Sequence, residues 1–129
     1  MKTNKSAVKG LGHDLIEISR IRQSVERHGE HFLNRLFTEQ EIAYCRKFED
    51  PIPHFAGRFA AKEAIAKALG TGFGADLGWH DIEVLNDERG KPVVRASDAL
   101  TKNFGDVCLL VSISHAADHA SAVAIWCEP

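Results

Sequence analysis

The residues best suited to chemistry are two acidic side chains that lie far apart in the chain. Glu63 is followed by Lys67, and a helix turning about 100° per residue places both on one narrow face with Ala56 and Ala60. Asp14 follows a Gly-x-Gly segment. Two carboxylates beside a lysine could hold a divalent cation against a diphosphate, because magnesium takes one or two protein carboxylates and completes its octahedron with phosphate oxygens and water.

Each of these residues also has a purely structural interpretation. A Glu63–Lys67 pair at i,i+4 is commonly a surface salt bridge that contributes at most about 0.5 kcal/mol. An aspartate placed like Asp14, after a strand, is more often a cap or a turn former than a metal ligand. The alanines on the helix face favour close packing, in which a charged pair is partly desolvated and needs a third partner. Spacing alone leaves both interpretations open.

Hydrophobic periodicity and turn residues predict the elements that position these side chains. A strand over 7–16 carries Asp14 near its far end, and Gly10 and Gly12 within it indicate close approach of another backbone or of a ligand. Further helices are predicted over 18–31, from a capping box at 38–41 to about 47, over 54–69 and over 97–104, and further strands over 79–85, from 93, over 107–114 and over 120–126. This pattern predicts an α+β fold in which a small, mainly antiparallel sheet packs with a long central helix.

Length and composition favour one globular domain spanning residues 1–129. Hydrophobic residues make up 44% and charged residues 26%, which are ordinary values for a soluble protein. A net charge of −2 argues against a nucleic-acid binder. Cys45, Cys108 and Cys127 show no metal-ligand spacing and indicate reduced thiols in a cytoplasmic protein. No apolar run predicts a signal peptide or a membrane span.

Four segments, in order, resemble the bacterial holo-[acyl-carrier-protein] synthases, the short single-domain type of 4′-phosphopantetheinyl transferase. They are 10–21 (GLGHDLIEISRI), 58–72 (RFAAKEAIAKALGTG), 81–92 with its DIEV start and GKP turn, and 112–115 (SISH). One such motif would be weak, but four in order are specific. The resemblance covers nearly the whole chain after about residue 8, so residues 1–7 are expected to form an N-terminal extension.

The resemblance implies a fold, an activity and a set of partners. The fold would be that of the 4′-phosphopantetheinyl transferases, assembled as a homotrimer with active sites at subunit interfaces. The activity would be Mg²⁺-dependent transfer of 4′-phosphopantetheine from coenzyme A to a serine of apo acyl carrier protein, in fatty acid biosynthesis. The products would be holo acyl carrier protein and adenosine 3′,5′-bisphosphate. No nucleic-acid or membrane partner is implied.

The resemblance also implies roles for individual residues. Asp14 and Glu63 would hold Mg²⁺ together with the coenzyme A diphosphate, and Lys67 would contact the phosphates and stabilise or protonate the leaving group. Glu63, directly or through a metal-bound water, would take the proton of the carrier serine. Positions that match cofactor-binding residues of the family are Arg58, Lys62, Gly70, Thr71, Asn86, Lys91, Pro92 and His115. Arg20 and Arg27 match arginines that dock the acidic helix of the carrier protein.

Two other functions stay open at this stage. A metal-dependent phosphodiester hydrolase would use the same carboxylates, and hydrolysis of coenzyme A without a carrier protein would favour it. A non-catalytic trimer that binds coenzyme A would show binding without transfer. The arginines at 20 and 27 also fit a solvated helix face, because Glu17 and Glu26 are interleaved with them, and His115 also fits an ordinary turn histidine.

Overall fold

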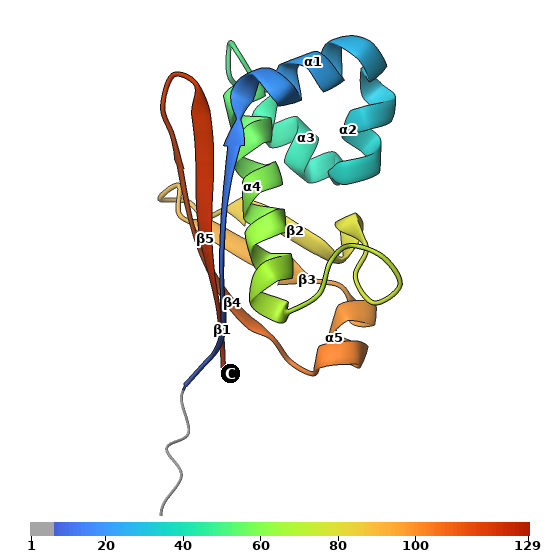
Figure 1. The fold of residues 1–129 in the computed structure, drawn as a ribbon, viewed down its shortest axis with the longest axis vertical. Helices are drawn as coiled ribbons and strands as arrows, with labels where there is room; N and C mark the ends of the chain where they lie inside the picture. Colours follow the sequence, from blue (N-terminus) through green and yellow to red (C-terminus); the bar gives the residue numbers. More distant parts are fainter. Residues whose placement is uncertain (1–6) are drawn as a thin grey trace, which may run out of the picture.

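One long helix, α4 (Ile52–Leu69), runs through the centre of the molecule and has other elements packed around it (Figure 1). The structure is a computed structural model that describes residues 7–129. A three-stranded antiparallel sheet lies on one side of α4, in the order β1 (Val8–Glu17), β5 (His119–Cys127), β4 (Cys108–His115). A separate antiparallel hairpin of β2 (Ile82–Asn86) and β3 (Pro92–Ala96) completes the strands.

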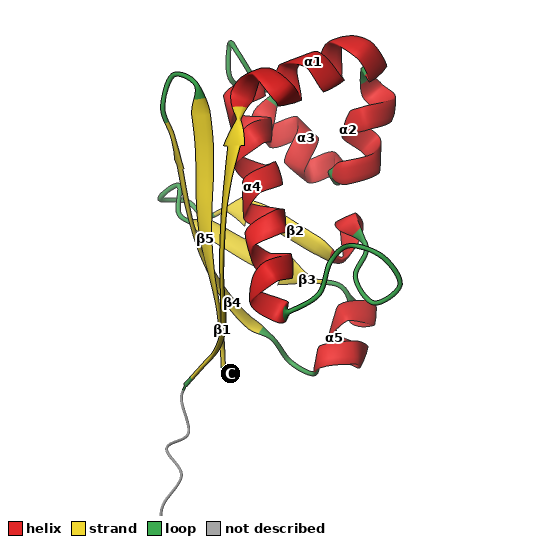
Figure 2. Ribbon diagram, viewed as in Figure 1, coloured by secondary structure: helices red, strands yellow, loops and turns green. Residues whose placement is uncertain are grey.

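The remaining helices cover the two ends of α4 (Figure 2). Around its N-terminal half lie α1 (Ile18–His28), α2 (Glu30–Leu36) and α3 (Glu39–Cys45). Near its C-terminal end lie the short 3₁₀ helix η1 (Trp79–Asp81) and α5 (Asp98–Phe104). The α+β class predicted from the sequence is confirmed, but the strands form two small sheets rather than one. No helix within residues 7–129 is long and apolar enough to cross a membrane.

Strand β1 lies unusually close to α4 because two of its residues have no side chain. A Cβ added at Gly12 would stand 1.8 Å from the carbonyl oxygen of Ala64, and one added at Gly10 would stand 1.9 Å from that of Ala68. The close backbone approach predicted from these glycines is therefore confirmed. Side chains alternate along a strand, so Asp14 points to the same face as Gly12, toward α4.

Most helix boundaries follow the capping residues read from the sequence. The Thr38 hydroxyl accepts from the Glu41 amide while the Glu41 carboxylate accepts from the Thr38 amide, which confirms the capping box. Gly70 ends α4 in the left-handed region, at φ 78°. Helix α4 begins two residues earlier than predicted, because Pro53 is tolerated in a first turn whose amides have no intrahelical partner.

Two predicted elements were wrong in their extent. The helix predicted over 18–31 stops at His28, because Gly29 takes a positive φ of 53°, and α2 then follows as a separate helix. The strand predicted from residue 79 begins only at Ile82, after the 3₁₀ turn of η1. Both errors lie outside the strand and helix that carry Asp14 and Glu63.

Candidate active site

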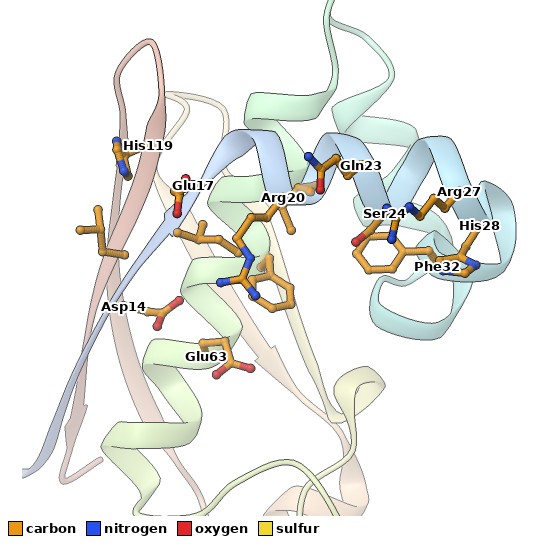
Figure 3. A pocket seen from close by; sticks show the side chains of 14 residues that line it. Asp14, Glu17, Arg20, Gln23, Ser24, Arg27, His28, Phe32, Glu63 and His119 are labelled. Atoms are coloured by element: carbon orange, nitrogen blue, oxygen red, sulfur yellow. The ribbon is translucent and has the colours of Figure 1, made fainter.

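Asp14 and Glu63 line one open cavity of about 620 Å³ between β1, α1 and α4 (Figure 3). Asp14 projects from β1 and Glu63 from the middle of α4, so the two carboxylates face the cavity from opposite walls. Arg20 reaches from α1 toward both of them. Apolar side chains complete part of the wall: Ile16, Ile21, Phe32 and Phe59. The structure thus brings together two carboxylates that are 49 positions apart in the sequence.

The charges in this cavity influence one another. Burial and the nearby Asp14 carboxylate raise the pKa of Glu63, while Lys67 opposes that rise. The Lys67 ammonium lies 3.1 Å from Asp14 Oδ1 and donates to the His13 carbonyl at 2.9 Å. The lysine therefore forms its salt bridge across to β1, and Asp14 is the third partner that the helix-face argument required. A simple surface pair between Glu63 and Lys67 is not what the structure contains.

This donor set fits a hard divalent cation. Asp14 and Glu63 offer carboxylate oxygens, and a cation between them would relieve the Asp14 repulsion that, together with the larger effect of burial, raises the pKa of Glu63. Residues 7–129 contain no group of three or more His, Cys, Asp or Glu side chains placed to hold a metal. Two carboxylates match an ion that retains water and takes substrate phosphate oxygens, as expected for Mg²⁺.

A second group of side chains, the cationic cluster of Arg58, His54 and His115, lies outside this cavity. Arg58 donates to the Asn86 side chain and lies over the Tyr44 ring, with its Cζ 4.3 Å from the ring centroid. His115 meets His54 edge to face, with 5.3 Å between ring centroids. Burial, together with His115 and Arg58, lowers the pKa of His54. Several cationic or protonatable groups gathered in this way favour a bound anion.

Lys62 belongs neither to the Asp14–Glu63 cavity nor to the cationic cluster. Its side chain is fully buried, and its ammonium lies within 3.0 Å of a Glu41 carboxylate oxygen and of two backbone carbonyl oxygens. All three of its donors therefore have partners inside the protein. The contact between Lys62 and cofactor phosphates stays a prediction, and in this structure the side chain has no exposed surface and no free donor.

The other predicted cofactor-binding residues lie at the ends of helices and strands, away from the Asp14–Glu63 cavity. Gly70 and Thr71 follow the C-terminal end of α4, and the turn between β2 and β3 carries Lys91 with Pro92 at the start of β3. None of them lines the Asp14–Glu63 cavity. Arg27, in contrast, lines the same cavity as Arg20, one wall of which is formed by α1. Both predicted docking arginines therefore line the cavity, Arg20 near the two carboxylates and Arg27 farther along α1 (Figure 3).

Sequence reasoning missed several residues that shape these sites. Phe32 and Phe59 line the cavity, and His54 joins the cationic cluster. His54 stands four residues before Arg58, a spacing that puts both on one side of α4 and could have indicated their proximity. Phe32 offered no such signal, because it lies on α2, which the sequence did not reveal.

Residues 10–124 match the family model described as the 4′-phosphopantetheinyl transferase superfamily. The chain belongs to this superfamily. The resemblance inferred from the four motifs is therefore confirmed over nearly the entire chain. The match begins at Gly10, and residues 1–6 of the expected N-terminal extension lie outside the described residues.

Individual members of the superfamily are similar to this chain over most of their length. Holo-[acyl-carrier-protein] synthase of Protochlamydia amoebophila is 51% identical over 117 residues, which cover 91% of this chain and 96% of that protein. The enzyme of the same name from Chlamydia pneumoniae is 51% identical over 115 residues, covering 89% and 93%.

Solved structures of the superfamily share this fold. Helicobacter pylori holo-[acyl-carrier-protein] synthase in complex with coenzyme A aligns with a TM-score of 0.82 at 34% identity, covering 90% of this chain and 98% of that one. The synthase from Bacillus anthracis, in complex with coenzyme A (3′,5′-ADP), aligns with a TM-score of 0.82 at 35% identity, covering 96% and 100%.

Proposed function

We propose that this chain is a holo-[acyl-carrier-protein] synthase, which moves 4′-phosphopantetheine from coenzyme A to a serine of apo acyl carrier protein. The observation that carries the proposal is the cavity in which Asp14 and Glu63 face each other beside Lys67 and Arg20. High identity to synthases over nearly their full length supports the same activity. The fatty acid pathway is the proposed role.

In this proposal, the residues of the cavity have separate roles in the transfer. Asp14 and Glu63 would hold Mg²⁺, which would neutralise charge on the diphosphate. Glu63, directly or through a water, takes the proton of the carrier serine as its oxygen attacks the β-phosphate. Lys67, held by Asp14 and by the His13 carbonyl, contacts the phosphates and stabilises the leaving bisphosphate.

The cationic cluster holds the nucleotide end of coenzyme A in this proposal. Arg58 is almost fully buried, and its Nε has no hydrogen-bond partner in the protein, so an anion could take that donor. His115, near the 3′-phosphate, and Asn86, near the adenine, complete the contact. Gly70 and Thr71 would let the backbone approach the nucleotide. Lys91 and Pro92 would border the adenine.

The proposed assembly is a homotrimer in which one chain supplies the carboxylate cavity and a neighbour supplies the cationic cluster. Two observations support it: the two groups do not share a cavity within one chain, and the outer face of the β1–β5–β4 sheet exposes large apolar side chains. Those side chains are Leu11, Leu15, Leu110 and Val123. Such a patch marks a protein interface. Sedimentation equilibrium should give three times the chain mass of 14.2 kDa; a monomer would contradict this assembly.

The carrier protein docks on α1 in this proposal. Arg20 and Arg27 both line the cavity that holds the carboxylates, so an acidic helix bound to them would bring its serine to Glu63. A cytoplasmic location is also proposed, supported by three cysteines that are all unpaired. Residues 1–129 are proposed to be a single domain.

Replacing Glu63 by glutamine tests the function. The substitution keeps the size of the side chain but removes its charge, so transfer to apo acyl carrier protein should fall at least about 100-fold. The matched control is Glu128→Gln, since Glu128 is exposed at the end of the chain. Transfer by Glu63→Gln at the wild-type rate, with a folded protein, would contradict the assignment.

A further inference from the structure

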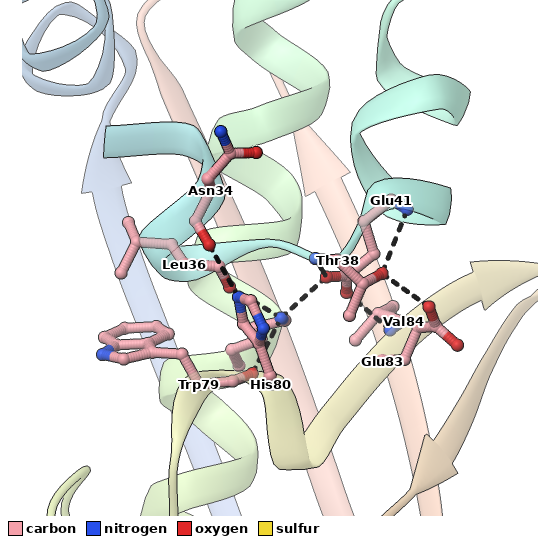
Figure 4. Close-up of polar contacts among 9 residues, drawn as sticks. Asn34, Leu36, Thr38, Glu41, Trp79, His80, Glu83 and Val84 are labelled. Carbon is pink, nitrogen blue, oxygen red and sulfur yellow. Dashed lines mark hydrogen bonds and ion pairs between the residues drawn. The ribbon is translucent and has the colours of Figure 1, made fainter. Parts of the chain in front are cut away.

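Lys62 and Glu41 form an ion pair in which both side chains are fully buried, the only such pair within residues 7–129. The ammonium of Lys62 donates to Glu41 Oε1 at 2.7 Å, to the Leu36 carbonyl at 2.8 Å and to the Trp79 carbonyl at 3.0 Å (Figure 4). These acceptors come from the end of α2, from α3 and from η1. One side chain of α4 is thus bonded to three separate elements.

Glu41 extends the same network on its other side. Its Oε1 also accepts from the Thr38 amide at 2.8 Å, and its Oε2 accepts from the Val84 amide of β2 at 2.7 Å. Thr38 in turn donates its hydroxyl to Glu83 at 2.5 Å. The carboxylate therefore has three internal donors and joins the start of α3 to the β2 strand.

Stability alone does not explain a buried ion pair. Removing two charges from water costs free energy that their attraction only partly offsets, and apolar pairs of equal volume often stabilise a protein as well or better. Apolar side chains, however, cannot form hydrogen bonds, whose preferred geometry fixes the relative orientation of the elements they join. Three hydrogen bonds from a single ammonium fix both the rotation of α4 about its axis and its position along that axis.

The consequence reaches the active site because Lys62 and Glu63 are consecutive in α4. They project about 100° apart, so one rotation of the helix moves both. Side chains extend about 5–6 Å from a helix axis, and a rotation of only about 10° would shift the Glu63 carboxylate by about 1 Å. A displacement of that size at a reacting group can cost about 100-fold in rate.

The network also supports a wall of the cavity. Lys62 holds the backbone of Trp79, and the Trp79 ring stacks on Phe73, with ring centroids 3.7 Å apart, and on Phe59, with centroids 5.4 Å apart. Phe59 lines the cavity one helical turn before Glu63. A change at the buried pair is thus transmitted both through the helix and through this aromatic stack.

We propose that Lys62, through its buried pair with Glu41, is a positioning residue that sets the placement of Glu63 opposite Asp14. The side chain touches neither substrate nor cofactor and acts through the orientation of α4. This inference rests on the proposed transferase function. It replaces the phosphate contact that the sequence had suggested for Lys62.

The test removes both charges together, in the double variant Lys62→Met/Glu41→Gln, so that no unpaired charge stays buried. We expect kcat for transfer to fall about 10- to 100-fold, while KM for coenzyme A stays within about threefold of wild type. Circular dichroism confirms that the variant is folded at the assay temperature. The matched control is Arg46→Met/Glu30→Gln, which neutralises an exposed ion pair between α2 and α3 and should keep the wild-type kcat.

A second variant, Glu41→Gln alone, keeps the Lys62 side chain and decides the matter if the double variant does not fold. It should lower kcat about fivefold or more at unchanged KM. Wild-type kcat in whichever of the two variants is folded would overturn the inference. So would a raised KM for coenzyme A at unchanged kcat, because that result would place Lys62 at the cofactor. Failure of the wild-type protein to transfer at all would instead refute the proposed function.

Discussion

Substituting Gly12 by alanine should disable the proposed enzyme without touching any charged residue. A Cβ at this position would stand 1.8 Å from the Ala64 carbonyl oxygen, whereas ordinary van der Waals contact begins at 3.4 Å. Strand and helix must therefore separate by about 1.6 Å, because both clashing groups are backbone-linked and cannot rotate away. Asp14 lies two residues farther along β1 and would move with the strand, away from Glu63.

A displacement of this size should lower kcat for transfer about 100-fold or more and destabilise the fold by about 1–3 kcal/mol through overpacking. The assay is transfer to apo acyl carrier protein together with urea unfolding of the same preparation. The matched control is Gly72→Ala, because an added Cβ there would meet nothing within 4 Å and Gly72 has no positive φ. Full activity and stability of Gly12→Ala would refute the close approach of β1 and α4 as the basis of the site.

Two further predictions concern the carrier surface and the buried thiol. Arg20→Glu should raise the KM for the acidic carrier protein about tenfold or more at low salt with a smaller change for coenzyme A, and an unchanged carrier KM would remove Arg20 from the docking surface. Burial raises the pKa of Cys45 to about 12, so this thiol stays protonated at pH 8. In the folded protein, iodoacetamide should therefore alkylate Cys108 and Cys127 well before Cys45. Unfolding the protein first should remove this difference. Mass mapping of the alkylated peptides measures this, and equal labelling of all three cysteines in the native protein would contradict the burial of Cys45.

Local signals in the sequence were sufficient for the parts of the fold that they control. The capping box at Thr38 and Glu41 depends on a few adjacent residues, and it forms as predicted. The paired glycines of β1 also indicated a close contact correctly, since a missing Cβ has an immediate steric meaning. The family match confirms the resemblance read from the motifs.

Such local signals could not predict the long-range contacts. Helix α4 is buried on nearly all sides, so its sequence carries no single apolar stripe from which the partners of Lys62 could be deduced. Glu41 reaches Lys62 from 21 positions away, and Lys67 turns to Asp14 from 53 positions away. Both pairings depend on how α3 and β1 pack on α4, which helical spacing alone does not reveal.

The most direct test of the proposed function is the mass of an apo acyl carrier protein after incubation with this protein, coenzyme A and Mg²⁺. We predict an increase by the mass of one phosphopantetheine, with release of adenosine 3′,5′-bisphosphate, and an increase at least about 100-fold slower when Glu63→Gln replaces the wild-type protein. An unchanged carrier mass with the wild-type protein would contradict the proposed function. Consumption of coenzyme A in the absence of the carrier would instead favour a phosphodiester hydrolase built on the same two carboxylates.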